Sequence, residues 1–194
     1  MGNGNTKKIM EDIIADAVNA TELTAISLRY FNPIGAHESA LIGEAPSAVP
    51  DNLVPYLTQT AIGIRPFLRV YGDDYDTPDG TPIRDYLHVT DLAKAHVLAL
   101  KRMLDGKMKS RYEAFNLGTG KGYSVKEVIQ SFETVSGVKL NYKILDRRPG
   151  DIVKIWADPS YANKELGWKA EKGLDEMTLS AWNWEKRLAE KSEQ

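Results

Sequence analysis

Apolar residues recur at helical spacing in several segments of the chain. The first such segment carries Ile9, Met10, Ile13, Ile14 and Ala17. This spacing predicts an amphipathic helix from about residue 6 to residue 18. The same periodicity predicts further helices that start after Asn52, at Thr90-Asp91 and after Ser124, and a last helix from Leu174 to Leu188.

Short runs of β-branched and aromatic residues alternate with these helices. They predict strands at residues 25–31, 68–71, 83–89, 112–117 and 142–145. Asn32-Pro33 ends the first strand, and the segment from Pro33 to Asp51 has no sustained periodicity, which predicts a long loop. Long loops inside compact domains are usually functional. The alternation of helices and strands indicates an α/β or α+β fold in one compact piece.

Several helix ends carry their own signals. Ser124 and Glu127 have the spacing of a capping box, and Gly137 is a suitable stop for the helix that follows them. Asn52 is expected to cap the next helix upstream, and Asp158-Pro159 to cap a short helix that ends at Gly167.

Composition narrows the classes of ligand. The chain has 194 residues, of which 42% are hydrophobic, a net charge of -2 and no cysteine. A charge this small favours a small-molecule site over a nucleic-acid surface. No apolar run is long enough to cross a membrane, so we expect a soluble, cytoplasmic protein with no membrane partner. Without cysteine and with three scattered histidines, we expect no metal site.

The start of the chain carries a catalytic pattern. Asn3-Gly4-Asn5-Thr6-Lys7 resembles the Tyr-Gly-x-[Ser/Thr]-Lys helix start of extended short-chain dehydrogenases/reductases, with Asn3 at the place of the catalytic Tyr. In that pattern the Lys lies on the same helix face as the Tyr and lowers the pKa of the phenol from about 10. Lys7 is present here, but the phenol is not.

Longer motifs resemble UDP-glucose 4-epimerases from end to end. These are LRYFNPIGAH at residues 28–37, PDNLVPY at 50–56, VYGDDYDT at 70–77, IRDYLHV at 83–89, NLGTG at 116–120 and RRPGD at 147–151. The RDY motif is widespread among sugar-nucleotide enzymes, whereas the FNPIGAH loop together with the YGDDYDT block is much narrower.

The resemblance implies a fold and a reaction. The fold would be the C-terminal part of an NAD(P)-binding Rossmann-like extended short-chain dehydrogenase/reductase, with a Rossmann remnant at about residues 4–32 and a small α/β substrate-binding domain at about residues 33–194. The reaction would interconvert UDP-galactose and UDP-glucose in galactose metabolism, through a 4-keto intermediate with transient reduction of NAD. The resemblance also allows a homodimer of the complete enzyme.

The resemblance assigns roles to single residues. Arg84 and Arg148 would bind the UDP diphosphate, for which forked guanidinium donors are well suited. Asp151 would accept from the ribose hydroxyls. Asn32 and Asn52 would donate to phosphate or hexose oxygens, and Leu53 and Tyr71 would lie on the two sides of the uracil. Phe31 and Lys7 would lie on the nicotinamide side of the pocket. Ile155 would limit the size of the group at the sugar C2.

Structural roles compete with these assignments. Arg84 could pair with Asp85, Arg147-Arg148 could be a solvated pair, and Gly118-Thr119-Gly120 fits a turn better than a phosphate cradle. His37, His88 and His96 are interpreted as structural.

Two departures from the family bear on activity. The Gly-x-x-Gly-x-x-Gly turn that binds the NAD pyrophosphate is not among these residues, and an amide at position 3 cannot transfer the proton. We therefore expect the chain alone to be inactive and not to retain NAD. Two alternatives stay open: a non-catalytic UDP-sugar-binding protein, and another nucleotide-sugar epimerase or dehydratase.

Overall fold

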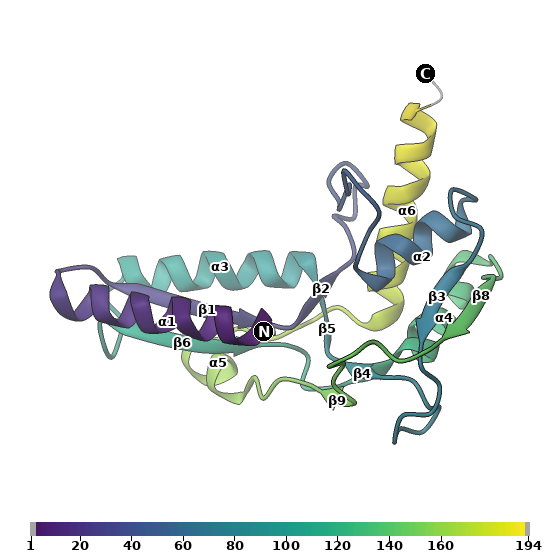
Figure 1. Ribbon diagram of the computed structural model, residues 1–194. Helices are drawn as coiled ribbons and strands as arrows, with labels where there is room; N and C mark the ends of the chain where they lie inside the picture. Colours follow the sequence, from purple (N-terminus) through teal and green to yellow (C-terminus); the bar gives the residue numbers. More distant parts are fainter. Residues whose placement is uncertain (1–2, 193–194) are drawn as a thin grey trace.

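A computed structural model describes residues 3–192 and the side chains of residues 4–191 (Figure 1). The helices are α1 (Asn3–Ala20), α2 (Leu53–Ala61), α3 (Val89–Leu104), α4 (Val125–Ser136), α5 (Ser160–Glu165) and α6 (Leu174–Ser192). The strands are β1 (Ala25–Tyr30), β2 (Asn32–Ile34), β3 (Leu68–Tyr71), β4 (Ile83–Arg84), β5 (Tyr86–His88), β6 (Tyr112–Leu117), β7 (Tyr123–Ser124), β8 (Tyr142–Leu145) and β9 (Lys154–Ile155).

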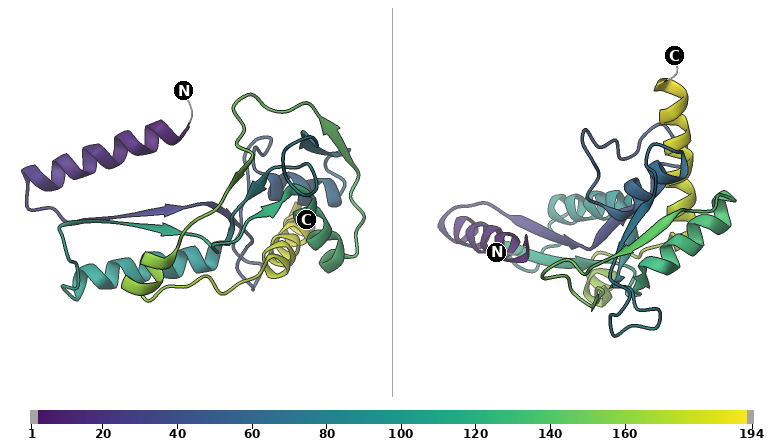
Figure 2. Two further views of the ribbon diagram at one scale, coloured as in Figure 1. Left: turned by 90° about the horizontal axis from the view of Figure 1, so that it is seen from below. Right: turned by 45° about the vertical axis from the view of Figure 1, so that its right-hand side comes forward.

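One group of elements is built on a parallel strand pair. β1 pairs with β6 in the register Ala25 to Tyr112 through Tyr30 to Leu117. Helices α1 and α3 lie on opposite sides of this pair (Figure 2, left). Ile26 and Leu28 of β1 pack on a buried set, the β6 cluster, which consists of Leu87, Leu92, Ala95, Phe115, Leu117, Ala162, Leu166 and Trp168.

A second group surrounds α6. Strands β3 and β8 are parallel neighbours, and α2 and α4 pack against α6 (Figure 1). The buried set here, the α6 cluster, consists of Ile34, Val54, Leu57, Leu68, Val70, Tyr86, Val128, Ile129, Phe132, Leu140, Leu174, Met177, Ala181 and Trp182. It draws on segments from residue 34 to residue 182, which makes this group depend on long-range contacts.

Short strands connect the two groups. β2 and β5 are parallel, and β4 lies between β7, which is antiparallel to it, and β9, which is parallel. β5 contributes to both clusters, with Leu87 in the β6 cluster and Tyr86 in the α6 cluster, and β2 contributes Ile34 to the α6 cluster. Segments on both sides of residue 33 pack in the β6 cluster, whereas the α6 cluster uses residues after it, and the predicted domain boundary at that residue stays a prediction.

Most predicted elements are confirmed. The predicted first helix lies inside α1, the strands at 68–71, 112–117 and 142–145 match β3, β6 and β8, and the last helix is α6. The capping box is present, because the Ser124 side chain accepts from the Glu127 amide while the Glu127 carboxylate accepts from the Ser124 amide. Gly137 ends α4 with a φ of 71°, a conformation that costs glycine little.

The prediction of a loop from Pro33 onward is wrong in its first residues. The chain stays extended through β2, where Asn32 to Ile34 pair with Tyr86 to His88. Proline favours an extended residue before it and tolerates a strand position whose N–H is not needed.

Three predicted helix starts differ in detail. Asn52 occupies the N-cap position of α2, but its side chain donates to the Glu44 carboxylate at 3.1 Å instead of capping. Helix α3 starts at Val89, where the His88 ring Nδ1 accepts from the Thr90 amide. Burial lowers the pKa of His88, which keeps this ring nitrogen available as an acceptor.

The third difference concerns α5. The helix ends at Glu165, before Gly167, and its N-cap residue Pro159 has no side-chain cap. The Asp158 carboxylate instead accepts from the Ser160 amide at 3.0 Å.

In the part of the chain that is described, no helix is both long and apolar enough to span a membrane.

A buried ion pair joins α3, β6 and α5, and its loss should destabilise the fold. The Arg102 guanidinium donates to both oxygens of Glu113, at 2.6 and 2.9 Å, and to the Glu165 carbonyl at 2.8 Å. We expect Arg102→Met to lower the free energy of unfolding by about 3 kcal/mol, because it leaves the Glu113 carboxylate buried without its cation. Chemical denaturation measures the loss.

A matched control is Lys107→Met, which removes an exposed ion pair with Asp105 and should change stability by less than about 1 kcal/mol. The Arg102 hydrogen bonds hold the pKa of Glu113 below its usual value of 4.5, so this stabilisation is present above pH 4.5 and is lost as the pH falls through the folded pKa. The difference between wild type and Arg102→Met should shrink accordingly. A difference that is equal at pH 7 and pH 3 would contradict this account.

Candidate functional site

A cavity of ≈ 550 Å³ lies between the two groups of elements. Its walls come from α1, the β1–β2 segment, α2, β3, the β4–β5 segment and the loop before β9. The long loop predicted from residue 33 also contributes, through Val49, Pro50, Asp51 and Asn52. The cavity is large enough for a ligand of nucleotide-sugar size.

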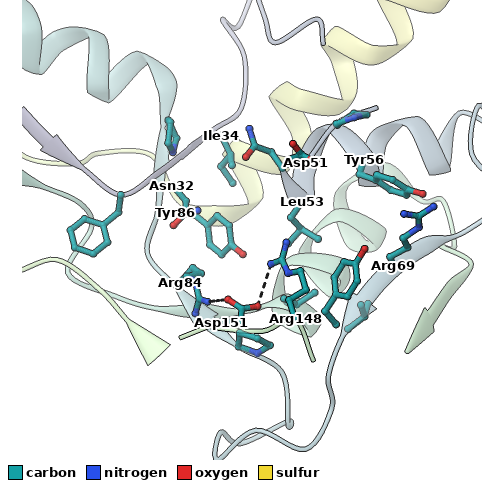
Figure 3. Close-up of a pocket in the computed structure, with 18 of the residues that line it drawn as sticks. Asn32, Ile34, Asp51, Leu53, Tyr56, Arg69, Arg84, Tyr86, Arg148 and Asp151 are labelled. Carbon is teal, nitrogen blue, oxygen red and sulfur yellow. Dashed lines mark hydrogen bonds and ion pairs between the residues drawn. The ribbon is translucent and has the colours of Figure 1, made fainter. Parts of the chain in front are cut away.

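Two arginines and one carboxylate form the charged centre of this cavity (Figure 3). Arg84 lies in β4 and donates to Asp151 Oδ1 at 2.5 Å, while Arg148 donates to Asp151 Oδ2 at 3.3 Å. Asp151 and Arg84 are largely buried, whereas the Arg148 side chain is 56% exposed. Two cations against one anion leave an excess positive charge that favours a polyanionic ligand.

The Arg84 backbone is held by its neighbour Asp85. The Asp85 carboxylate is fully buried and accepts hydrogen bonds from the amides of Thr119, Gly120 and Ala157 and from the Thr119 hydroxyl. Gly118 has no room for a Cβ, which would collide with this carboxylate and with Ala157. Asp85 thus joins the loop after β6 and the segment after β9 to the strand that carries Arg84.

One end of the cavity is aromatic and cationic. Leu53 and Tyr56 come from α2, and Arg69 and Tyr71 come from β3. The Arg148 guanidinium carbon lies 4.8 Å from the centre of the Tyr71 ring. Flat rings beside apolar side chains are suited to a heterocyclic base.

The other end lies toward α1 and β1. Lys7 projects from the first turns of α1, Tyr30 ends β1, and Phe31 follows it. Lys7 is exposed and Phe31 is half-buried. Figure 1 shows α1 and β3 on opposite sides of the molecule, so these residues and Arg69 mark the two ends of one long cavity.

Comparison with known proteins places the chain in a family. Residues 4–180 match the family described as GDP-mannose 4,6 dehydratase. This chain belongs to that family. Within it, the chain is 50% identical over 183 residues to the UDP-glucose 4-epimerase of Bacillus subtilis and 50% identical over 185 residues to that of Mus musculus. It spans about half the length of these relatives, 53% and 52%, although the matches include 94% and 95% of the chain.

Solved structures agree with this placement in the GDP-mannose 4,6-dehydratase family. A UDP-glucose 4-epimerase from Stenotrophomonas maltophila, with bound NAD and formylated UDP-arabinopyranose, superposes with a TM-score of 0.91 at 49% identity over 97% of this chain and 55% of that one. The enzyme from Bifidobacterium longum, in complex with NAD+ and UDP, gives 0.89 at 50% identity over 95% and 54%. The resemblance to UDP-glucose 4-epimerases and the predicted α/β fold of the extended dehydrogenase/reductase type are confirmed.

The cavity brings together most residues that the sequence singled out. Its walls include Lys7, Phe31, Asn32, Asn52, Leu53, Tyr71, Arg84, Arg148 and Asp151. Ile155 is not part of the wall but is the register partner of Arg84 in β9 and is partly exposed. The side chain of Asn3 lies outside the described residues. The functional roles of all these residues stay predictions.

Several competing interpretations are now decided. Arg84 pairs with Asp151 and not with Asp85, and Arg147 and Arg148 have separate carboxylate partners, Asp74 and Asp151. The amides of Thr119 and Gly120 bind the internal Asp85 carboxylate, so the interpretation of residues 118–120 as a phosphate cradle is not supported. Among the described residues, no group of three or more His, Cys, Asp or Glu side chains could hold a metal ion.

Several wall residues were not assigned from the sequence, among them Tyr86, Tyr56 and Arg69. Tyr86 lies between Arg84 and the β2 strand, and burial raises the pKa of its hydroxyl, which therefore stays protonated as a donor. Tyr56 and Arg69 line the aromatic end. The alternation of β3, in which Leu68 and Val70 are buried and Arg69 is exposed, was a usable signal for Arg69.

Replacement of Asp85 tests whether its buried carboxylate stabilises the segments around Arg84. We expect Asp85→Asn to lower the free energy of unfolding by about 2 kcal/mol, because one amide nitrogen would face backbone donors that now bind an oxygen. Thermal and chemical denaturation measure this. Asp76→Asn, at an exposed position of the nearby loop, is the matched control and should change little. If Asp85→Asn and Asp76→Asn are equally stable, the Asp85 carboxylate does not stabilise these segments.

Proposed function

We propose that this chain is the nucleotide-sugar-binding part of a UDP-glucose 4-epimerase, which interconverts UDP-galactose and UDP-glucose. The observation that carries this proposal is the single cavity that contains both the arginine pair and Lys7. Identities of about 50% to UDP-glucose 4-epimerases over 94–95% of the chain support it. The epimerases themselves are about twice as long, so the complete reaction is proposed for an enzyme that also contains the remaining elements.

The charged centre is proposed to hold the diphosphate of the nucleotide sugar. Arg84 and Arg148 supply forked donors to its oxygens, and Asp151 orients both forks before the ligand arrives. Asp151 is also available to ribose hydroxyls when the diphosphate draws the guanidinium groups away. Leu53 and Tyr71 would lie beside the uracil.

The amides Asn32 and Asn52 complete the polar wall. Both are exposed, so their donors can meet phosphate or hexose oxygens. Asn52 donates to Glu44 in the absence of ligand and would exchange that partner. Ile155 is proposed to limit the size of the group at the sugar C2, next to its strand partner Arg84.

NAD is the cofactor that the opposite end of the cavity fits. The half-buried Phe31 ring offers a flat wall for a nicotinamide ring, and the exposed Lys7 ammonium offers donors for ribose hydroxyls. When bound, NAD would accept hydride from the sugar C4 and return it to the other face. Lys7 would lower the pKa of a tyrosine at the position of Asn3, which would take the proton from the sugar O4.

Further parts of the proposal concern the chain by itself. It contains neither that tyrosine nor the Gly-x-x-Gly-x-x-Gly turn, so we expect it not to turn over substrate or retain NAD. A homodimer of the complete enzyme, a cytoplasmic location, and the absence of nucleic-acid and membrane partners also remain predictions.

Two alternatives to this proposal are a UDP-sugar-binding protein without turnover and another nucleotide-sugar epimerase or dehydratase. The second is suggested by the family description, which names a dehydratase.

The first prediction of this proposal concerns UDP binding. Arg84→Ala and Arg148→Ala should each weaken UDP binding by roughly ten- to a hundredfold, because a hydrogen bond to a charged group contributes about 1.5 to 3 kcal/mol. Isothermal titration calorimetry on the chain measures the affinities. Arg147→Ala is the matched control, since the Arg147 side chain pairs with Asp74 and does not line the cavity. If Arg84→Ala and Arg148→Ala bind UDP as tightly as the wild type and the control do, these two arginines have structural roles only.

The second prediction tests Lys7 in an active enzyme. A chimera would join to this chain the part of the Bacillus subtilis relative that the chain does not match, with Asn3→Tyr restoring the phenol. We expect it to convert UDP-galactose to UDP-glucose, while the chain alone does not. Lys7→Met should reduce kcat by roughly 10²- to 10⁴-fold at neutral pH, the range typical of general-base catalysis.

The pH dependence makes this test specific. The loss in Lys7→Met should shrink as the pH rises toward about 10, where an unperturbed phenol ionises without help. Lys8→Met, which changes the neighbouring charge outside the cavity wall, should leave kcat unchanged. If kcat is unaffected by Lys7→Met at neutral pH, the alignment of this helix with the catalytic pattern is wrong.

A further inference from the structure

The loop between β2 and α2 forms part of the cavity wall and is attached to α6. Residues 49–52 of this loop line the cavity. Earlier in the loop, the Glu44 carbonyl accepts a hydrogen bond from the Trp184 indole N–H of α6 at 2.8 Å. Figure 1 shows the loop alongside α6, on the side away from β8. The cavity wall is therefore connected to a helix whose described residues do not themselves line the cavity.

The attachment of the loop to α6 is tight. Gly43 has no room for a side chain, because a Cβ there would lie 2.4 Å from Trp184 Cγ. The Ser180 hydroxyl oxygen, one helical turn before Trp184, accepts from the Ala36 amide at 3.1 Å. Residues four apart lie on the same face of a helix, so α6 holds the loop at two successive points. A second cavity, between the loop, α2 and α6, has a volume of only ≈ 20 Å³, which leaves room for about one water molecule.

Glu44 connects the attachment point to the cavity wall. Its carbonyl accepts from Trp184, and its carboxylate Oε1 accepts from Asn52 Nδ2 at 3.1 Å. Asn52 is the N-cap residue of α2 but makes no cap hydrogen bond, so Glu44 orients its carboxamide. Asn52 lines the cavity, and a carboxamide has two N–H donors and one acceptor oxygen. The backbone position of Glu44 therefore determines where these polar groups lie in the wall.

Orientation of the carboxamide before binding should increase affinity. Asn52 and Glu44 are both exposed, so without their contact the Asn52 side chain would rotate freely. A ligand that fixes a freely rotating side chain binds more weakly, because ordering the side chain costs entropy. Glu44 thus holds the Asn52 donor until a ligand oxygen replaces it, in the way that Asp151 holds the two arginines.

We propose that Trp184 is a positioning residue for the nucleotide-sugar site, which acts on Asn52 through Glu44. The Trp184 indole N–H fixes the loop backbone at Glu44, the Glu44 carboxylate orients the carboxamide, and the carboxamide donates to a phosphate or hexose oxygen. Trp184 itself does not line the cavity. The proposal rests on the proposed function for the role of Asn52.

Trp184→Phe tests the proposal, because it removes the indole N–H and keeps an aromatic ring against Gly43. We expect UDP-glucose to bind about three- to tenfold more weakly, the range expected for loss of one neutral hydrogen bond. In an Asn52→Ala background the same substitution should leave the affinity unchanged, since the group on which it acts is missing. Calorimetry on the four chains measures the affinities, and the double-mutant cycle isolates the coupling. A merely structural role of Trp184 would give the same loss in both backgrounds.

Glu44 provides a second test. Glu44→Gln keeps an acceptor oxygen and should retain most of the affinity for UDP-glucose, whereas Glu44→Ala should weaken binding as much as Trp184→Phe does. The matched control is Trp182→Phe on the same helix, where the Trp182 ring packs edge-on against Phe132 in the α6 cluster. This control should lower the free energy of unfolding, measured by chemical denaturation, and leave the affinity unchanged.

The outcomes separate this assignment from the proposed function. If Trp184→Phe keeps the wild-type affinity, or weakens binding alike in both backgrounds, the assignment is overturned while the proposed function stands. It is also overturned if Asn52→Ala alone has no effect, or if Trp182→Phe weakens binding by the same factor. If Glu44→Ala binds more tightly than wild type, Glu44 only competes with the ligand, and the assignment is again overturned. If wild type does not bind UDP-glucose, the proposed function fails, and this assignment fails with it.

Discussion

The buried carboxylate of Asp85 is the constraint on which the cavity depends. Four donors from three residues, Thr119, Gly120 and Ala157, converge on it. Because a buried charge is costly unless its hydrogen bonds are satisfied, these segments have one favourable arrangement. That arrangement places β4 beside β9, and so sets the position from which Arg84 reaches Asp151. Arg84 thus lines the cavity, while its neighbour Asp85 holds the surrounding segments together.

The Arg84–Asp151–Arg148 group balances two requirements. Two guanidinium groups close together repel each other, and the carboxylate between them offsets this repulsion while no ligand is bound. A diphosphate carries more negative charge and more acceptor oxygens than one carboxylate, so it can compete for the same donors. In the proposed function, Asp151 would therefore order the donors before a diphosphate binds, which would lower the entropy lost on binding.

Periodicity and local signals were sufficient for much of the fold. The capping box at Ser124 and the stop at Gly137 depend on residues within a few positions of each other, and both were predictable. The pairing of Arg84 with Asp151, 67 positions apart, was not, because nothing local distinguishes it from pairing with Asp85. The resemblance to a family predicted many residues that line one cavity, but it did not predict which of them contact each other. The extended course of the chain at Pro33 likewise depends on a distant strand, β5.

The two ends of the cavity have separate structural supports. Lys7 belongs to α1, which packs on β1 and is tied to it by the ion pair of Glu11 with Arg29. The arginine end belongs to elements around the α6 cluster and to the β7–β4–β9 sheet. The strands β2 and β5 join the two supports. In the proposed function, this short parallel pair therefore sets the distance between a diphosphate at the arginines and Lys7, so that positioning of the sugar and affinity for the nucleotide would depend on different parts of the chain.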